Sequence, residues 1–335
     1  MQLGLNALYA FLDACTTECL VLATVTRTEG ASYRKAGAMM LIDEHFNASG
    51  LVSGGCLEDD LKAHAEGVFN AGESKTVLYD LSQEEAASMW GLGLGCGGQI
   101  EVLLERIGSD NGYGGLEPIR EFYYSGHACT LHKTIASDRS ERIGTYELTQ
   151  ELAADLAGLN RHAAEAVTRD QTTTLSIPIS PVRRLLVCGA GPDAIPLVAL
   201  AGNLSWQVIV ADPRPAYLRK EHFPTAWQLL ECSPSELGNK LQSVQAAVIM
   251  THNVERDCDW LVALHERAIQ YIGLLGPTAR RDLLLERSGL KLESRLHGPA
   301  GLNIGAVLPE EIALSILAEI HAVLGLRSGL PLSAL

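Results

Sequence analysis

In the C-terminal half of the chain, short apolar runs alternate with amphipathic stretches. The apolar runs predict four strands, at 184–188, 206–211, 246–251 and 271–275. The intervening patterns predict helices near 194–201, 235–242, 256–269 and 277–288. A last helix is predicted to begin at Pro309, since proline and two acidic residues suit a first helical turn. Alternating strands and helices predict a Rossmann-like, doubly wound parallel sheet, which we place at 181–330.

The N-terminal 110 residues mix the two kinds of pattern. Helical periodicity predicts helices at 5–17 and 56–70. Runs rich in Val, Leu, Ile and Thr predict strands at 19–27, 38–43, 48–53, 74–80 and 99–106. We therefore expect a mixed α/β domain over residues 1–110, and the fold class of the whole chain is α/β.

The pattern is weakest between these two parts, so residues 111–180 are treated as a connecting region of uncertain structure. Strands are predicted at 128–136 and 142–148, and a helix at 151–167. Residues 170–181 contain three threonines and two prolines, a composition that predicts a linker. A chain of 335 residues exceeds the usual size of one core, so two domains are expected.

Charge and cysteine usage narrow the classes of function. A net charge of −14 argues against a nucleic-acid partner and against an anionic membrane surface. No apolar run approaches the ~20 residues that a membrane span requires. The eight cysteines form no C-x-x-C pair and the chain is long, which indicates a reducing, cytoplasmic setting.

Two cysteines lie in glycine-rich segments. Cys56 follows two glycines and Cys96 precedes two glycines, which are Gly54, Gly55, Gly97 and Gly98. Glycine lets the backbone approach a ligand closely, because it has no Cβ. A thiol there can ligate a soft metal or accept sulfur as a persulfide. A catalytic nucleophile would need a positioned base, and two small buried cysteines are the structural alternative.

A dinucleotide-type fingerprint follows the first strand of the C-terminal half. It consists of Gly189, Gly191 and Ala194 at the expected spacing. Asp212 follows about twenty residues later, where an acid can bind ribose hydroxyls. Arg214 is a candidate phosphate contact. This half therefore predicts a site for a phosphate or a nucleotide.

Other residues near the fingerprint bear on that site. Pro192 lacks an N–H donor and Asp193 repels an anion, and both stand where a pyrophosphate would lie. His252 follows the third strand, at the ligand-binding edge of such a sheet, and is either functional or structural. A Rossmann-type sheet without a nucleotide is an alternative, because fold alone does not carry function.

A third group of candidates lies in the N-terminal half. Arg34 and Lys35 occupy a loop bounded by Gly30 and Gly37, and offer cations for a phosphate. The alternative is that both are ordinary solvated charges.

Taken together, these motifs resemble the XdhC/CoxI family. The resemblance runs from about residue 15 to 325 and is weakest over 107–180. It is carried by the segments 30–37, 54–58, 95–105, 189–191, 212–215, 251–253, 271–276 and 309–319. Members of this family are accessory factors for molybdenum hydroxylases such as xanthine dehydrogenase. They bind molybdenum cofactor (molybdopterin with its metal), assist its sulfuration with a cysteine desulfurase, and deliver it to the apo-enzyme.

The resemblance implies roles for the candidate residues. Cys56, and after it Cys96, would contact molybdenum or the transferred sulfur, and Arg34 and Lys35 would contact phosphate. The Rossmann-like half would complete a cleft and bind the phosphate or a nucleotide end of the pterin, through Gly189, Gly191, Asp212, Arg214 and His252. The chain would then be a carrier rather than a catalyst, and the resemblance is compatible with a homodimer.

Two other functions remain open from the sequence. An NAD(P)-dependent oxidoreductase would use the site between Gly189 and Asp212, although no clear catalytic acid or base accompanies it. A scaffold that only docks a dehydrogenase and a desulfurase would bind partners without a pterin.

Overall fold

The computed structural model describes residues 4–30, 32–80, 98–150, 164–238, 241, 243–291 and 293–334. The chain divides into two compact units, Met1–Pro181 and Val182–Leu335. The described residues between 111 and 180 therefore belong to the first unit rather than to a region of their own. In the described part, no helix combines the length and the apolar character that a bilayer crossing requires.

The first unit is built on an antiparallel sheet of five strands in the order β3-β2-β1-β5-β4. The strands are β1 (Leu20–Glu29), β2 (Met39–Asp43), β3 (Ala48–Gly50), β4 (Lys75–Asp80) and β5 (Gln99–Ile107). The central strand β1 is buried on both faces over its first seven residues. One face contributes to an apolar cluster with helix α2 (Glu58–Ala71). The other contributes to a cluster with α1 (Leu5–Ala14), α4 (Leu116–Ser125) and a second sheet.

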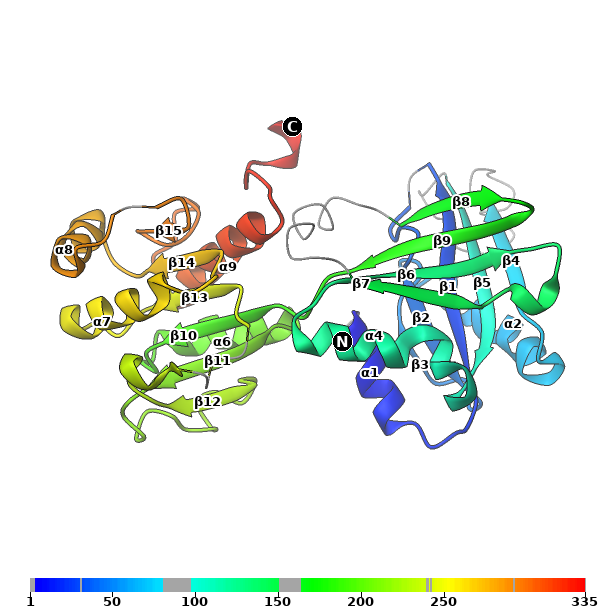
Figure 1. The fold of residues 1–335 in the computed structure, drawn as a ribbon, viewed down its shortest axis with the longest axis horizontal. Helices are drawn as coiled ribbons and strands as arrows, with labels where there is room; N and C mark the ends of the chain where they lie inside the picture. Colours follow the sequence, from blue (N-terminus) through cyan, green and yellow to red (C-terminus); the bar gives the residue numbers. More distant parts are fainter. Residues whose placement is uncertain are drawn as a thin grey trace. The chain divides into compact units, whose positions relative to one another are not determined.

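That second sheet has four strands in the order β7-β6-β9-β8 (Figure 1). They are β6 (Cys129–Ala136), β7 (Tyr146–Gln150), β8 (Glu165–Arg169) and β9 (Thr172–Ile179). The linker predicted at 170–181 is wrong, because β9 fills most of it and pairs with both β6 and β8. The helix predicted at 151–167 is wrong at its C-terminal end, where β8 begins, and residues 151–163 lie outside the described residues.

The second unit confirms the predicted Rossmann-like sheet. Its six parallel strands have the order β12-β11-β10-β13-β14-β15. They are β10 (Arg184–Cys188), β11 (Gln207–Asp212), β12 (Gln228–Glu231), β13 (Ala246–Ile249), β14 (Tyr271–Leu274) and β15 (Leu296–His297). Sequence patterns identified four of these strands and missed the edge strands β12 and β15.

Helices cover both faces of this sheet (Figure 1). Helices α6 (Ala194–Asn203) and α9 (Pro309–Leu324) share one apolar cluster with the sheet, and α7 (Val254–His265) and α8 (Thr278–Ser288) share the other. The helix predicted at 235–242 is wrong in its described part, which holds a short 3-10 turn at Pro234–Glu236. Further 3-10 turns lie at Ser109–Gly115, Ser140–Arg142 and Leu332–Ala334.

The strand order places a switch point between β10 and β13. From β10 the chain proceeds outward through β11 and β12, and it then crosses back to β13 on the other side of β10. The loops that follow β10 and β13 therefore diverge. In open α/β sheets, ligands bind in the crevice that such diverging loops leave at the carboxyl ends of the strands.

Candidate functional site

Several predicted site residues of the first unit lie at one end of its five-stranded sheet. Strand β1 ends and β5 begins at the pair Glu29–Gln99. Nearby, β2 begins and β3 ends around the pair Met40–Gly50. Because these strands are antiparallel, the loop after β1, the loop after β3 and the buried Gly98 share this end of the sheet. Cys96 and Gly97 lie outside the described residues, so their predicted roles stay predictions.

The two described loops touch each other. The Nε of Arg34 donates a hydrogen bond of 3.1 Å to the carbonyl oxygen of Leu51. A Cβ on Gly54 would lie 3.9 Å from the Cγ of Tyr33. The structure therefore brings the Arg34 loop against the loop that carries Cys56. Lys35 is exposed, and its Nζ donates to the hydroxyl of Ser32 at 3.2 Å.

Ser53 and Glu58 hold the cysteine loop in shape. The hydroxyl oxygen of Ser53 accepts the N–H groups of Gly55, Cys56 and Leu57 at 3.1–3.2 Å. That hydroxyl donates to the Glu58 carboxylate at 2.6 Å, which also accepts the N–H of Ser53 at 2.9 Å. Sequence analysis missed both roles, although a serine before a turn and an acid at the first helical residue are capping signals.

This network changes the expected chemistry of the loop. The N–H groups of Gly55, Cys56 and Leu57 all donate to the Ser53 hydroxyl, so they are already used within the loop. Gly55 has a φ of +104°, which favours glycine, and a Cβ on it would meet open space. Cys56 is half-buried and follows the exposed Gly54 and Gly55 in the chain, and its Sγ lies 3.6 Å from the Ser53 hydroxyl.

Contacts within the protein surround both glycines of the Rossmann fingerprint and require glycine at the first of them. Gly189 has a φ of +115°, and a Cβ on it would lie 2.7 Å from the carbonyl oxygen of Met250. A Cβ on Gly191 would lie 2.6 Å from Oδ1 of Asp193. The tight turn is therefore as predicted, but its second glycine is covered by a carboxylate of the protein itself.

Asp212 and Arg214 are paired with each other. The buried Asp212 carboxylate accepts two hydrogen bonds of 2.8 Å from the Arg214 guanidinium and one of 2.9 Å from the N–H of Ala190. The guanidinium also lies 4.0 Å from the centre of the Tyr217 ring. The predicted contacts of Asp212 and Arg214 with a cofactor stay predictions, and both groups are already engaged.

These hydrogen bonds make the second unit sensitive to acid. Burial alone would raise the pKa of Asp212, but the bonds from Arg214 and the Ala190 N–H hold it below its ordinary value. The ionised carboxylate therefore stabilises the unit above about pH 4, and this contribution is lost as pH falls through the lower folded pKa.

We expect Asp212→Asn to lower the free energy of unfolding of the second unit by about 1–2 kcal/mol at neutral pH. Urea titrations should show that difference constant from pH 5 to 8 and shrinking below pH 4; a difference that stays the same at pH 3.5 would contradict the assignment.

His252 lines a pocket at the switch point. The pocket has a volume of about 340 Å³ and lies beyond the ends of β10, β13 and β14, beside the first turns of α9. The ring Nε2 of His252 is 2.7 Å from Oδ2 of Asp193. The structure thus brings His252 to the fingerprint loop, as its place after the third strand predicted.

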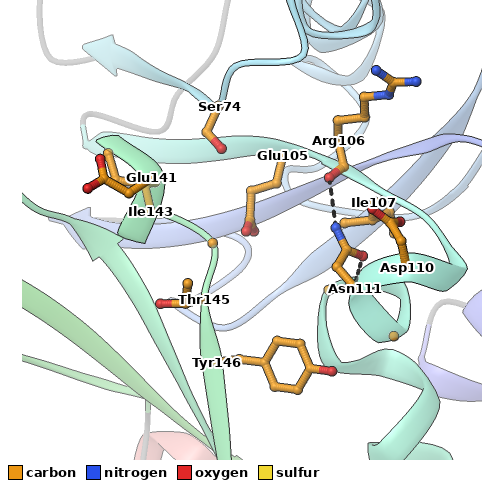
Figure 2. A pocket seen from close by; sticks show the side chains of 13 residues that line it. Ser74, Glu105, Arg106, Ile107, Asp110, Asn111, Glu141, Ile143, Thr145 and Tyr146 are labelled. Carbon is orange, nitrogen blue, oxygen red and sulfur yellow. Dashed lines mark hydrogen bonds between the residues drawn. The ribbon is translucent and has the colours of Figure 1, made fainter. Parts of the chain in front are cut away.

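A second, polar pocket of about 480 Å³ lies in the first unit and was not predicted. Figure 2 shows Glu105 in this pocket near Ser74, Thr145 and Tyr146. Oε2 of Glu105 is 2.8 Å from Nζ of Lys133, and both side chains are almost completely buried. No motif could have signalled this pair, because the two residues belong to different sheets.

Comparison with known proteins gives the same division of the chain. A family model described as "XdhC and CoxI family" matches residues 16–80, and one described as "XdhC Rossmann domain" matches residues 185–320. The chain is 38% identical over 325 residues to a protein of Bacillus subtilis that is named as a probable subunit of xanthine dehydrogenase. That match covers 93% of this chain and 96% of the Bacillus protein.

Two further proteins extend the comparison. The "Molybdenum cofactor insertion chaperone PaoD" of Escherichia coli is 22% identical over 90% of this chain and 83% of its own length. A crystal structure of a protein named as a xanthine dehydrogenase of Bacillus halodurans superposes with a TM-score of 0.80. That protein is 34% identical, and the match covers 97% of this chain and 96% of the other. This chain therefore belongs to the XdhC/CoxI family.

Proposed function

We propose that this protein is a maturation factor for a molybdenum hydroxylase of the xanthine dehydrogenase type. It binds molybdenum cofactor as cargo, assists its sulfuration and helps insert it into the apo-enzyme. The names of two relatives support the proposal, since one refers to xanthine dehydrogenase and the other to a molybdenum cofactor insertion chaperone. In this function the protein carries a cofactor and does not itself turn over a substrate.

The observation that carries the proposal is the arrangement around Cys56. A half-buried thiol directly follows two exposed glycines in the chain, and the loop of Arg34 touches the same segment. Thiolates favour soft metals and sulfur chemistry, and guanidinium groups bind phosphates through paired N–H donors. Arg34 uses its Nε to hold the loop, so its terminal nitrogens are the ones offered to a phosphate.

Partners and setting follow from the same proposal. The apo-enzyme and a cysteine desulfurase are the expected protein partners, the cytoplasm is the expected compartment, and a homodimer is the expected assembly. The pterin would be bound with or without a nucleotide. Cys56 is the first candidate for contact with molybdenum or transferred sulfur, and Cys96 is the second.

The test compares cofactor content after purification from a host that makes molybdenum cofactor. Oxidation to a fluorescent pterin and metal analysis give the cofactor bound per chain. We expect Cys56→Ala to lower it about tenfold or more, since losing even an outer partner of a metal site costs about that much. Cys15→Ala is the matched control, because Cys15 is also a half-buried thiol of the first unit.

The result is decisive in either direction if circular dichroism shows that all variants are folded. Loss of pterin and molybdenum from Cys56→Ala, with wild-type content in Cys15→Ala, supports the proposed site. Equal cofactor content in wild type and in a Cys56→Ala, Cys96→Ala double variant refutes the thiol role. Stable binding of the two partner proteins without any pterin would instead favour the scaffold function.

A further inference from the structure

The switch-point pocket of the second unit is apolar over most of its wall. Its apolar lining consists of Leu197, Met250, Leu275, Ile312, Ala313 and Ile316. They come from α6, α9 and the segments that follow β13 and β14. A volume of about 340 Å³ is within the range of pockets that enclose small ligands. All residues that line the pocket belong to the second unit, and the inference drawn from it does not rest on the proposed cofactor function.

One polar pair faces this apolar wall. Asp193 and His252 both line the pocket and bind each other at 2.7 Å. The imidazole is 62% exposed and the carboxylate is 23% exposed. The other residues lining the pocket are apolar, glycine or proline, so the described lining contains no lysine or arginine.

The turn that carries His252 is held from both sides. His252 has a φ of 59°, an uncommon conformation for a residue other than glycine. On one side, Thr251 donates its N–H and its hydroxyl to the buried Asp257 carboxylate at 3.1 and 2.5 Å. On the other, the side chain of Asn253 accepts the N–H of Arg256 at 3.0 Å and caps α7. Such a conformation persists only when its surroundings impose it, so the contacts on both sides hold the backbone of His252 in place.

The same loop is unsuited to a pyrophosphate. Asp193 holds a carboxylate oxygen against Gly191, which is where the fingerprint would admit a phosphate. The N–H of Ala190 already donates to Asp212, and Pro192 has no N–H to offer. A phosphate there would be repelled by the Asp193 carboxylate. It would also find the Ala190 N–H already engaged and no N–H on Pro192.

We propose that this pocket binds an uncharged ligand with an apolar body and an N–H or O–H donor at its polar end. When a neutral His252 donates from Nε2 to Asp193, its Nδ1 is an acceptor. Oδ1 of Asp193 is also an acceptor. Nδ1 of His252 and Oδ1 of Asp193 would therefore accept a hydrogen bond from a donor on the ligand. The apolar walls would pack against a hydrocarbon or ring surface. A ligand of this kind differs from the nucleotide expected from the fingerprint.

Indole tests the proposal, because it has an apolar body and a single N–H donor. Binding to the full-length protein can be followed by NMR of ¹³C-labelled methionine methyl groups, with Met250 in the pocket wall as the reporter. We expect indole to shift the Met250 signal with a dissociation constant of roughly 1 mM, as suits so small a ligand. 1-Methylindole lacks the donor and should bind several-fold to about tenfold more weakly.

Two variants test whether His252, rather than the apolar wall, makes the pocket prefer indole over 1-methylindole. His252→Gly keeps the left-handed backbone and removes the imidazole, so it should abolish the discrimination between indole and 1-methylindole. His222→Gly, at an exposed histidine elsewhere in the unit, should leave it unchanged. Equal binding of the two probes to wild type, no shift of Met250 with indole, or tighter binding of NAD⁺ than of indole at Met250 would each overturn the proposal. These measurements use protein without molybdenum cofactor, so their outcome can be told apart from a failure of cofactor binding at Cys56.

Discussion

We expect Lys133→Met to lower the free energy of unfolding of the first unit by about 3–5 kcal/mol. Lys133 on β6 and Glu105 on β5 join the two sheets of this unit through a contact of 2.8 Å, and their side chains are 0% and 4% exposed. Methionine fills a similar volume without the ammonium group. Glu105 would then be a carboxylate without its cation in a mostly dehydrated place, which is the costly half of a broken buried pair.

Urea unfolding with hydrogen exchange of the β5 and β6 peptides measures this loss in the unit concerned. Lys62→Met is the matched control, because Lys62 pairs at 2.9 Å with an Asp59 side chain that is 95% exposed. That surface substitution should cost no more than about 0.5 kcal/mol. A Lys133→Met, Glu105→Leu double variant should recover most of the lost stability, because it removes both charges.

A contradictory outcome would also be informative about the polar pocket. Glu105 lines that pocket, as Figure 2 shows. If Lys133→Met behaves like Lys62→Met, water in the pocket solvates the Glu105 carboxylate well enough to replace the ammonium group. If the double variant is no more stable than Lys133→Met, the loss comes from packing between the sheets rather than from an unpaired charge.

The sequence predicted the inner strands of the Rossmann unit because their burial leaves a simple pattern. Strands β10 and β13 are covered by helices on both faces, and every residue in them is buried. Such strands appear in a sequence as unbroken apolar runs. The edge strands β12 and β15 have only four and two residues, and their side chains are half-buried or exposed, so no run marks them.

The strand β9 was mistaken for a linker for a related reason. Its buried residues are Leu175, Ile177 and Ile179, alternating with threonine, serine and proline. Alternation of this kind is typical of a strand with one buried face, and threonine favours strands. Two prolines near its end outweighed that signal in the prediction. The inner position of β9, between β6 and β8, depends on pairings over long distances in the chain that composition does not reveal.

Motifs located the candidate sites but not the partners of each side chain. The fingerprint predicted the turn at Gly189 correctly, because a positive φ and a close backbone neighbour both require glycine there. The pairing of Asp193 with His252 joins residues that are 59 positions apart. Asp212 was expected to face a ribose, which stays a prediction, and its hydrogen bonds with the neighbouring Arg214 were not predicted. Contacts of this kind follow from the three-dimensional arrangement and were beyond a single sequence.

The second large effect is expected from Asp257→Ala. This substitution should lower the free energy of unfolding of the second unit by about 2–4 kcal/mol. This carboxylate is 2% exposed and accepts hydrogen bonds from Thr251 and from the guanidinium of Arg280. Asp257→Ala leaves a buried N–H and a partly buried cation without their acceptor. Arg280 retains some access to water, with 22% of its side chain exposed, which keeps the expected cost below that of Lys133→Met.

In a Trp90→Phe background, fluorescence of the three tryptophans of the second unit, which include the buried Trp260 on the same helix, follows the unfolding of this unit in urea. Asp259→Ala, on the exposed side of α7, is the matched control and should change stability by no more than about 0.5 kcal/mol. Asp257→Asn should lie between the two, because an amide oxygen still accepts from Thr251 but no longer neutralises Arg280. Equal stability of the Asp257→Ala and Asp259→Ala variants would show that the carboxylate does not hold the turn.

The same variant tests whether the turn is built for its histidine. Asp257 touches no ligand in the proposed site and acts only through Thr251, the residue before His252. If the network exists to direct the imidazole, folded Asp257→Ala should still bind indole against Met250 but should lose the preference for indole over 1-methylindole. If the network serves stability alone, the preference should survive the loss of stability. The left-handed backbone at His252 favours the first outcome, because folding the chain does not by itself require a histidine in that conformation.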